Sequence, residues 1–575
     1  MRMVEPRGAA SSPEMSAQSI PSPRGRGRHA KRRGSSAGGT LARSSALLAV
    51  ATVASRAGGL GRMVLQNIAL GTLGVGAAYN TANTVPTSLY TLMIGGALNS
   101  VLVPQLVRAR SEHPDGGRAH EQRLVTMMLV VLVVGTVTAV AFAPQIASLY
   151  MASDRDLALT IAFTRLLLPQ ILFYGVYFLL GQLLNARGRF AAMGWAPMLN
   201  NVVLIVLFAV FYLVVPRGDG YHLGSGQVTA LGLVTTAGIA VQALCLLPAL
   251  ARAGFSFRLR FDWRGTGLGK SVSAARWTLL FVLVNQIALA VVTRFANARD
   301  AMDAHAGSTP YFFAQSLWIL PQSVVTVSLV TAMLPGLTRA VAEHRIDAAR
   351  ADLSQALRNT GALIVPAAFF FLALGPQLAT LLFSYGLGGP LSAPPFGEML
   401  QAFALGLIPF SAQYVLLRGF YAFEDTRTPF WMAAWISLLD IVLASACHLW
   451  LPARYAVVGM AAAYAVSYLA GLLITAQRLR RRFDGRLDGR RVLRTYGRLV
   501  AAASLAGAAG WAVAQCLPTA TGGSPLRLAT SALSSLTAGG LVMLVAFLLA
   551  SHLFGIAEVQ ALLRRLPLHR FSPRR

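Results

Sequence analysis

Arginine side chains inside apolar stretches are the first candidates for chemistry in this sequence. The segment SRAGGLGR places Arg56 and Arg62 in one such stretch, Arg165 lies in another and Arg294 in a third. If these stretches cross a membrane, a buried charge is costly, and such residues mark functional sites by default. The planar guanidinium binds phosphate or carboxylate through two parallel hydrogen bonds. The arginines therefore predict a site for a phosphate-bearing substrate.

The spacing of the first pair sets a geometric condition. Six residues turn a regular helix by about 600°, so Arg56 and Arg62 point in different directions on a straight helix. Gly58 and Gly59 lie between them and weaken the helix. A bend at these glycines would let both side chains reach one cavity.

Other readings of the polar residues stay open. Arg165 and Arg294 sit close enough to helix ends to extend into water instead. Asn80 and Asn83, in the second apolar stretch, fit the binding of sugar hydroxyls if they face a cavity. Between helices, the same side chains serve equally well as packing contacts.

Catalytic and metal-binding patterns are missing from the sequence. It has no Walker motif, no HExxH and no GxSxG. Its three cysteines, Cys245, Cys447 and Cys516, lack metal-ligand spacing, so we expect neither a disulfide nor a metal site. We expect a transporter rather than an enzyme, with no cofactor. The sequence does not identify the ion or membrane potential that drives it.

The elements that must position these residues are long apolar blocks. The chain has 575 residues, 55% hydrophobic and 12% charged. Crossing the hydrocarbon core takes about 20 apolar residues per helix. Fourteen blocks of this kind are centred near residues 55, 92, 135, 170, 203, 240, 285, 325, 367, 411, 440, 467, 508 and 540. The sequence predicts an all-α integral membrane protein with about fourteen spans.

The basic residues set the predicted orientation. If alternate loops lie on alternate sides, one side holds 40 of the 50 Lys and Arg and the other side holds five. This asymmetry is the positive-inside pattern. It predicts a multi-pass plasma-membrane protein with both termini in the cytoplasm. The net charge of +29 is thereby explained by topology, and no nucleic-acid partner is expected.

An internal repeat organises the spans. Five residues match five others at one offset of 240: Pro169, Tyr174, Arg187, Phe190 and Trp195 match Pro409, Tyr414, Arg427, Phe430 and Trp435. At the same offset, Asn185 matches Asp425, and Asn200 matches Asp440. The shift is six spans, and an even shift keeps the orientation, so the repeats are parallel. The substrate site of such a transporter lies between the lobes near the membrane midplane.

Domain boundaries follow from the repeat and from composition. We expect a disordered basic tail over 1–41, a first six-helix lobe over 42–255, and a second over 256–482. Two added helices occupy 483–555, and a basic tail occupies 556–575. Prolines within spans, which bend or interrupt helices, are Pro86, Pro169, Pro321, Pro366 and Pro409.

Several segments, taken in order, resemble one known family. They are SRAGGLGRMVLQNIALG, NTVPTSLYTLMIGGALNSVLVPQL, GQLLNARGRFAAMGWAPMLNN, LPQSVVTVSLVTAMLPGLTR and GFYAFEDTRTP, spread over residues 42 to about 480. The chain resembles the MurJ/MviN lipid II flippases of the multidrug/oligosaccharidyl-lipid/polysaccharide exporter superfamily, in their actinobacterial form.

The resemblance implies a function in cell-wall biogenesis. The substrate would be lipid II, the undecaprenyl-diphosphate-linked peptidoglycan precursor, carried from the inner to the outer leaflet by alternating access. The resemblance also implies a cationic central cavity, with Arg56 and Arg62 as the family's first-helix arginines, and a groove for the lipid tail at the last two spans. Membrane lipids and cell-wall synthesis proteins would be its other partners.

Other family positions differ in this chain. The family's second-helix arginine pair falls on Tyr90 and Thr91, and its eighth-span Asp-Arg pair falls on Gln315 and Ser316. We therefore place Tyr90, Gln315 and Ser316 among the candidate cavity residues. Our hypothesis is that Arg294 supplies part of the missing positive charge.

Four alternatives remain at this point. A flippase for another lipid-linked saccharide fits the departures from the family pattern. A drug/cation antiporter of the same superfamily would carry acidic cavity residues and usually twelve spans. A membrane scaffold that recruits partners through its basic tail, and a polytopic glycosyltransferase, are the other two. The cavity arginines and the fourteen spans favour the lipid II flippase.

Overall fold

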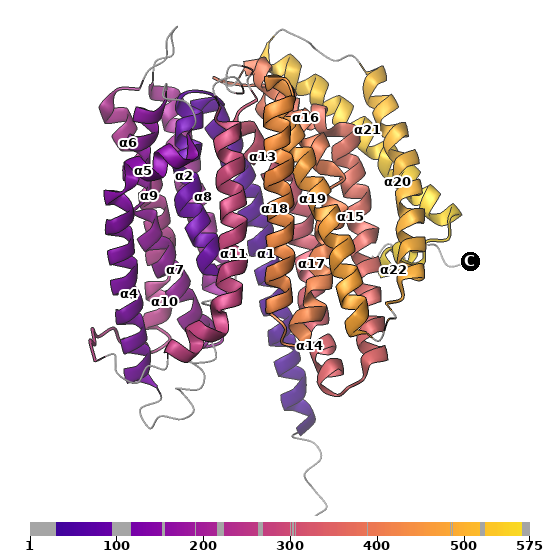
Figure 1. The fold of residues 1–575 in the computed structure, drawn as a ribbon, viewed down its shortest axis with the longest axis horizontal. Helices are drawn as coiled ribbons and strands as arrows, with labels where there is room; N and C mark the ends of the chain where they lie inside the picture. The colour runs from indigo at the N-terminus through magenta and orange to yellow at the C-terminus, as the bar shows by residue number, and fades with distance from the viewer. Residues whose placement is uncertain are drawn as a thin grey trace, which may run out of the picture. The chain divides into compact units, whose positions relative to one another are not determined.

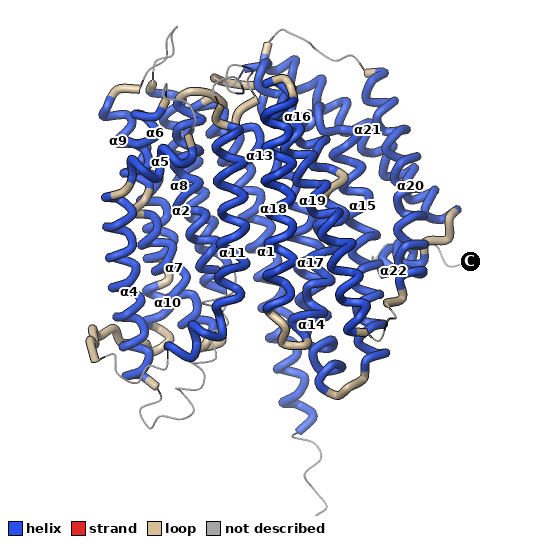
Figure 2. Tube along the Cα trace, viewed as in Figure 1, coloured by secondary structure: helices blue, strands red, loops and turns tan. Residues whose placement is uncertain are grey.

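The regular secondary structure of the computed structural model is helical throughout the residues that it describes, with loops and turns between the helices (Figure 2). These are residues 30–94, 117–151, 156–189, 191–215, 223–262, 268–298, 301, 304, 306–387, 389–483, 485, 487–517 and 524–565. No strand occurs in this part of the chain. The predicted all-α fold class is confirmed.

The helices follow one another along the chain in the order labelled in Figure 1. The first group is α1 Ala30–Leu70, α2 Val75–Ile94, α4 Arg118–Ala141, α5 Ala143–Tyr150, α6 Leu157–Leu167, α7 Gln170–Asn185, α8 Ala191–Val214, α9 Ser225–Leu244 and α10 Leu247–Ala251. The second group is α11 Leu268–Ala296, α13 Ser308–Pro321, the π-helix η1 Gln322–Thr326, α14 Val327–Ala342, α15 Ile346–Phe383, α16 Gly389–Ala404, α17 Leu407–Ala422, α18 Arg427–Trp450 and α19 Ala453–Arg482. The last helices are α20 Gly489–Cys516, α21 Pro525–Leu553 and α22 Ala557–Arg565.

Most of these helices are long and apolar enough to cross a membrane. Eleven helical segments qualify within the described chain, three of them made of consecutive helices such as α6 with α7, and the bent pair α16 and α17 raises the number to twelve. The helices α1 and α2 cover the other two predicted spans but fall outside that group. The chain is a multi-pass membrane protein, and the count of fourteen spans stays a prediction.

By internal contacts, the chain divides into two units, Met1–Val50 and Ala51–Arg575. The helix α1 begins at Ala30, within the segment predicted as a disordered tail. A helix that is already nucleated extends at little cost, which explains a start ahead of the apolar block. The rest of that tail, residues 1–29, and residues 566–575 lie outside the described part of the chain. All structural features below lie in the second unit.

Helix packing in the second unit falls into two groups. The helices α2 to α10 contact mainly one another, and α11 to α19 do the same. We call the first set, together with α1 from Ala51 onward, the N-lobe and the second set the C-lobe; Asn201 of α8 donates to the carbonyl oxygen of Ser55 on α1. The C-lobe core surrounds Trp318, which is fully buried against Phe403 and Phe410. The helices α20 and α21 pack closely on each other and on α15, as the yellow helices beside α15 in Figure 1 show.

Proline explains three of the helix breaks. Pro169 separates α6 from α7, and Pro321 ends α13 where η1 begins. Pro409 stands in the first turn of α17, just after a 46° bend between α16 and α17. A proline cannot donate the backbone hydrogen bond that continues a helix. Pro86 and Pro366, by contrast, lie inside continuous helices.

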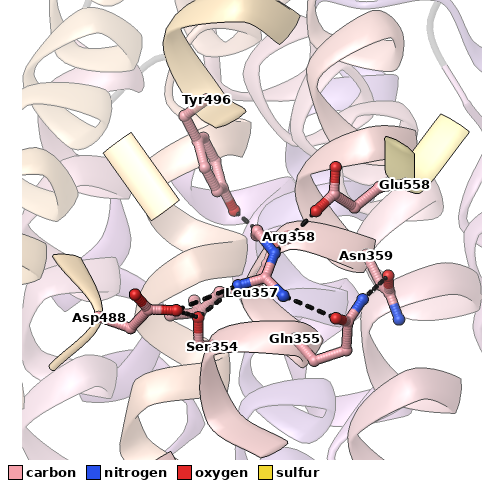
Figure 3. A network of polar contacts seen from close by, with 8 residues as sticks. All are labelled: Ser354, Gln355, Leu357, Arg358, Asn359, Asp488, Tyr496 and Glu558. Carbon is pink, nitrogen blue, oxygen red and sulfur yellow. Dashed lines mark hydrogen bonds and ion pairs between the residues drawn. The ribbon is translucent and has the colours of Figure 1, made fainter. Parts of the chain in front are cut away.

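Buried ion pairs fix one end of each lobe. In the N-lobe, Glu121 on α4 accepts from Arg187 at 2.6 Å, and both side chains are almost fully buried. In the C-lobe, Arg358 on α15 is buried and pairs with Glu558 of α22 at 2.7 Å and with Asp488 just before α20 at 3.4 Å. Figure 3 shows these contacts converging on the guanidinium. The last helices are thereby anchored to α15.

Candidate transport cavity

Two adjoining cavities lie in the second unit, lined by helices of both lobes. The first, about 530 Å³, is lined by Arg56 and Arg62 of α1 and by amide side chains of α8 and α9, and we call it the arginine compartment. Its amides are Asn200, Asn201 and Gln242. Gly59 and Leu320 also line it, from α1 and from the end of α13.

The second cavity, about 540 Å³, is lined mostly by uncharged polar side chains, and we call it the amide compartment. Its polar lining consists of Gln66, Asn80, Asn83, Thr84, Thr87, Ser88, Asn285, Gln286, Gln315, Ser437 and the carboxylate Asp440. Three tyrosines, Tyr311, Tyr464 and Tyr468, add aromatic walls. Arg62, Met63, Tyr174 and Ser316 line both compartments, so the two meet around these residues.

Arg56 and Arg62 come together on the arginine compartment even though α1 has no break at the glycines between them. Arg56 is exposed, whereas Arg62 is partly buried and its Nε is buried with no hydrogen-bond partner among the described residues. Such an orphaned cationic donor is suited to an anionic ligand, because an unpaired buried polar group is costly. Gly58 instead faces α8, where an added Cβ would lie 3.0 Å from the sulfur of Met198.

The two candidate asparagines of α2 both line the amide compartment but differ in their contacts. Asn80 accepts from Gln66 at 2.7 Å and donates to Thr309 at 3.1 Å, so its side chain is engaged in packing. The Oδ1 of Asn83 is buried without a partner in the described chain. Asn83 is therefore the better placed of the two to receive a donor from a ligand.

Two of the three candidate positions where this chain departs from the family pattern can be located in the cavity. Gln315 and Ser316 line the cavity, as expected for residues at the family's charged positions. Tyr90 belongs to α2, but its side chain lies outside the described residues.

Two candidate arginines do not line either compartment. Arg165 is exposed in the last turn of α6. Arg294, in the last turn of α11, donates to the backbone carbonyl oxygens of Ser148 at 2.6 Å and Met151 at 3.2 Å, at the end of α5. The structure therefore does not bring Arg294 together with Arg56 and Arg62. The hypothesis that it adds charge to the cavity has no geometric support.

The contacts of Arg294 belong to a larger set that joins the lobes where α1 ends and α2 begins. Asn67 donates to the carbonyl oxygen of Phe383 at 3.1 Å. Asn297 donates to Thr81 at 2.9 Å and to the carbonyl oxygen of Tyr150 at 3.0 Å. These bonds, together with those of Arg294, tie the lobes together at this end, which we call the α1–α2 end.

Backbone contact closes the α1–α2 end further. The amide of Leu387 donates to the carbonyl oxygen of Ile68 at 3.0 Å. Gly386 has a φ of 67°, and an added Cβ would lie 2.3 Å from that same oxygen. Both the left-handed conformation and the close approach require glycine here.

Several lining residues were not predicted for the site. Tyr174 and Asn200 were noticed only as members of the repeat. Asp440, the match of Asn200, lines the amide compartment, whereas Tyr414, the match of Tyr174, lines neither compartment. Asn201 and Gln242 gave no such signal. Their cavity positions depend on which face of α8 and α9 meets α1, which tertiary packing decides.

Comparison with known proteins agrees with this geometry. The family model described as "Lipid II flippase MurJ" matches residues 67–530. A probable lipid II flippase MurJ of Rhizobium meliloti is 28% identical over 415 residues, which cover 70% of this chain and 75% of that protein. The lipid II flippase MurJ of Burkholderia cenocepacia is 26% identical over 67% of this chain and 74% of its own.

Solved structures share the fold. A lipid II flippase MurJ in an inward closed conformation superposes with a TM-score of 0.69 at 17% identity, covering 88% of this chain and 99% of that one. An inward-facing MATE-family multidrug transporter of the MOP superfamily gives 0.57 at 15% identity, covering 75% and 98%. The family match extends over most of the chain and over helices of both lobes. The chain belongs to the lipid II flippase MurJ family.

Proposed function

We propose that this protein translocates the undecaprenyl-diphosphate-linked peptidoglycan precursor lipid II from the inner to the outer leaflet of the plasma membrane. The observation that carries the proposal is the cavity itself. Two arginines of α1 line it, and one of them has an orphaned buried donor. Diphosphate is the group in lipid II that guanidinium recognises best.

The sizes and polarity of the compartments fit a large headgroup. The arginine compartment takes the diphosphate, and the amide compartment offers donors and acceptors for sugar hydroxyls and peptide groups. No cofactor is needed for such binding and release.

The lipid tail requires a separate path, because it stays in hydrocarbon. The helices α20 and α21 carry exposed apolar side chains, among them Leu505, Leu541 and Leu544, each more than half exposed. We assign the tail to this apolar surface.

Alternating access follows from where the lobes are joined. With both termini in the cytoplasm, as the distribution of basic residues predicts, the α1–α2 end faces outward. The inter-lobe bonds of Asn67, Asn297 and Arg294 then seal the cavity from the outside. Transport requires these bonds to break and the opposite end to close.

Complementation tests the function. The resident lipid II flippase of a host is depleted, this chain is expressed, and lipid II exposed on the outer leaflet is measured. Rescue by the wild type, together with loss of rescue in Arg56→Ala and Arg62→Ala at equal membrane levels, is expected. The matched control is Arg165→Ala, which removes an exposed arginine away from the cavity and should rescue fully. No rescue by a well-expressed wild type would contradict the proposal.

A further inference from the structure

Asp440 is a buried carboxylate that the headgroup scheme above leaves unused. It lies within α18, lines the amide compartment and is 5% exposed. Its Oδ1 is buried and has no hydrogen-bond partner among the described residues. A buried charge without a partner is strongly disfavoured, so this position calls for a cation or a proton donor from outside the chain.

Two further acceptors on the same cavity are in the same condition. The Oε1 of Gln286 on α11 and the Oδ1 of Asn83 on α2 are buried without partners in the described chain, and both residues line the amide compartment. Three residues that line one cavity therefore each carry an acceptor oxygen without a partner among the described residues. A ligand rich in N–H donors satisfies them, and a primary ammonium group offers three donors.

The aromatic lining and the single carboxylate favour an organic ammonium over a divalent metal ion. The rings of Tyr464 and Tyr468 lie with centroids 4.8 Å apart, and Tyr311 lines the same cavity. Ring faces attract ammonium groups. Divalent hard cations instead gather several oxygen ligands, usually with more than one carboxylate. The described residues contain no group of three or more His, Cys, Asp or Glu able to hold a metal.

Charge is therefore separated across the cavity. Arg56 lines the arginine compartment alone, Arg62 lies where the two compartments meet, and the carboxylate of Asp440 lines the amide compartment alone. A ligand that spans both compartments complements these charges when its anionic group lies in the arginine compartment and its cationic group lies in the amide compartment.

We propose that the amide compartment binds a primary ammonium group on the peptide part of the substrate, with Asp440 as its counter-ion and Gln286 and Asn83 as neutral acceptors. This inference rests on the proposed function, and it adds a binding subsite for the peptide part of the lipid II headgroup. It makes Asp440 a specificity-determining residue that distinguishes headgroups by the charge of their peptide.

Binding to the purified full-length protein in lipid nanodiscs tests this subsite. The two probes are lipid II whose peptide carries a free primary amine and the same molecule with that amine acetylated. The wild type is expected to bind the free amine about tenfold more tightly, because acetylation removes the charge that pairs with Asp440. Asp440→Asn is expected to bind both probes equally, and Asp440→Glu to restore the preference.

Controls separate this subsite from the proposed function. Arg62→Ala should weaken both probes by the same factor. Glu398→Gln changes a carboxylate of the same lobe that pairs with Arg454 outside the cavity, and it should keep the preference. A wild type that binds neither probe would overturn the proposed function. A wild type that binds both equally, or an Asp440→Asn effect that depends on sodium concentration and not on acetylation, would overturn the ammonium subsite alone.

Discussion

The two lobes share one plan but place different chemistry at matching positions. Asn200 and Asp440 match in the repeat, and each lines a cavity with a buried, unpartnered Oδ1. In the N-lobe this position is a neutral amide on the same compartment as Arg56 and Arg62, and in the C-lobe it is a carboxylate with no ion pair among the described residues. Matching positions of the two repeats thus both line the cavity, and the different residue types at these positions give its two compartments different polarity.

The lobes also differ in the buried charge that they carry on α4 and α15. The buried residue is the acid Glu121 on α4 in the N-lobe and the base Arg358 on α15 in the C-lobe. Glu121 pairs within its own lobe, through Arg187, which also stacks on Phe255 at 5.3 Å. Arg358 pairs with residues from the last helices instead. The buried charge of α4 therefore pairs within the N-lobe, whereas the buried charge of α15 connects the C-lobe to α20 and α22.

Removing Arg358 should break that anchoring most severely. Arg358→Leu leaves the buried Glu558 without its partner, and losing one member of a buried pair costs about 3–5 kcal/mol. We expect a large drop in the thermal midpoint of the purified protein and protease cleavage near residues 485–490 before the rest of the chain. Arg345→Ala breaks an exposed pair with Glu343 near the start of the same helix and should cost less than about 1 kcal/mol. Equal losses for the two variants would remove the distinction between the lobes.

Giving the Asn200 position the same carboxylate as the matching Asp440 position should weaken lipid II binding. Asn200→Asp places a second carboxylate on the arginine compartment, where it competes with the substrate diphosphate for the guanidinium groups. We expect about tenfold weaker lipid II binding. Asn200→Ser keeps the wall neutral and serves as the control. Unchanged binding by Asn200→Asp at normal expression would show that this wall does not meet the diphosphate.

The exposed contact between α4 and the inter-lobe segment should have the smallest effect. Asp262 pairs with Arg123, and this hydrogen bond holds the pKa of the Asp262 carboxyl below its usual value. A lowered pKa contributes stability above the unfolded value of about 3.9, and that contribution is lost as pH falls through the lower folded value. Between pH 5 and 8, Asp262→Asn should therefore differ from the wild type by a small constant amount in thermal midpoint. A difference that grows between pH 5 and 8 would contradict this assignment.

Much of the fold was predictable because membrane helices must satisfy their own backbone. Apolar block length predicted the long apolar helices but not the short helices α5, α10 and α22, and Pro169, Pro321 and Pro409 coincide with breaks. The predicted lobe boundaries and both terminal tails remain untested.

The site was predictable only where residue type alone restricts the choice. Arg56 and Arg62 were expected on chemical grounds, since charge within a span demands a reason. The placement of Arg294 was not predictable, because the carbonyl oxygens of Ser148 and Met151 that it contacts are made available by the end of α5. Every residue has a backbone carbonyl, so the sequence does not show which of them is free to accept a hydrogen bond.

The central claim is that a diphosphate crosses the membrane through the arginine compartment. Flipping of fluorescent lipid II in proteoliposomes tests this claim most directly. Wild-type protein should accelerate flipping over protein-free vesicles. Arg62→Ala should lose about a hundredfold of that rate, and Arg62→Lys should recover part of it, because lysine restores the charge but not the bidentate geometry. Arg165→Ala should match the wild type. Wild-type flipping rates in Arg62→Ala would contradict the account.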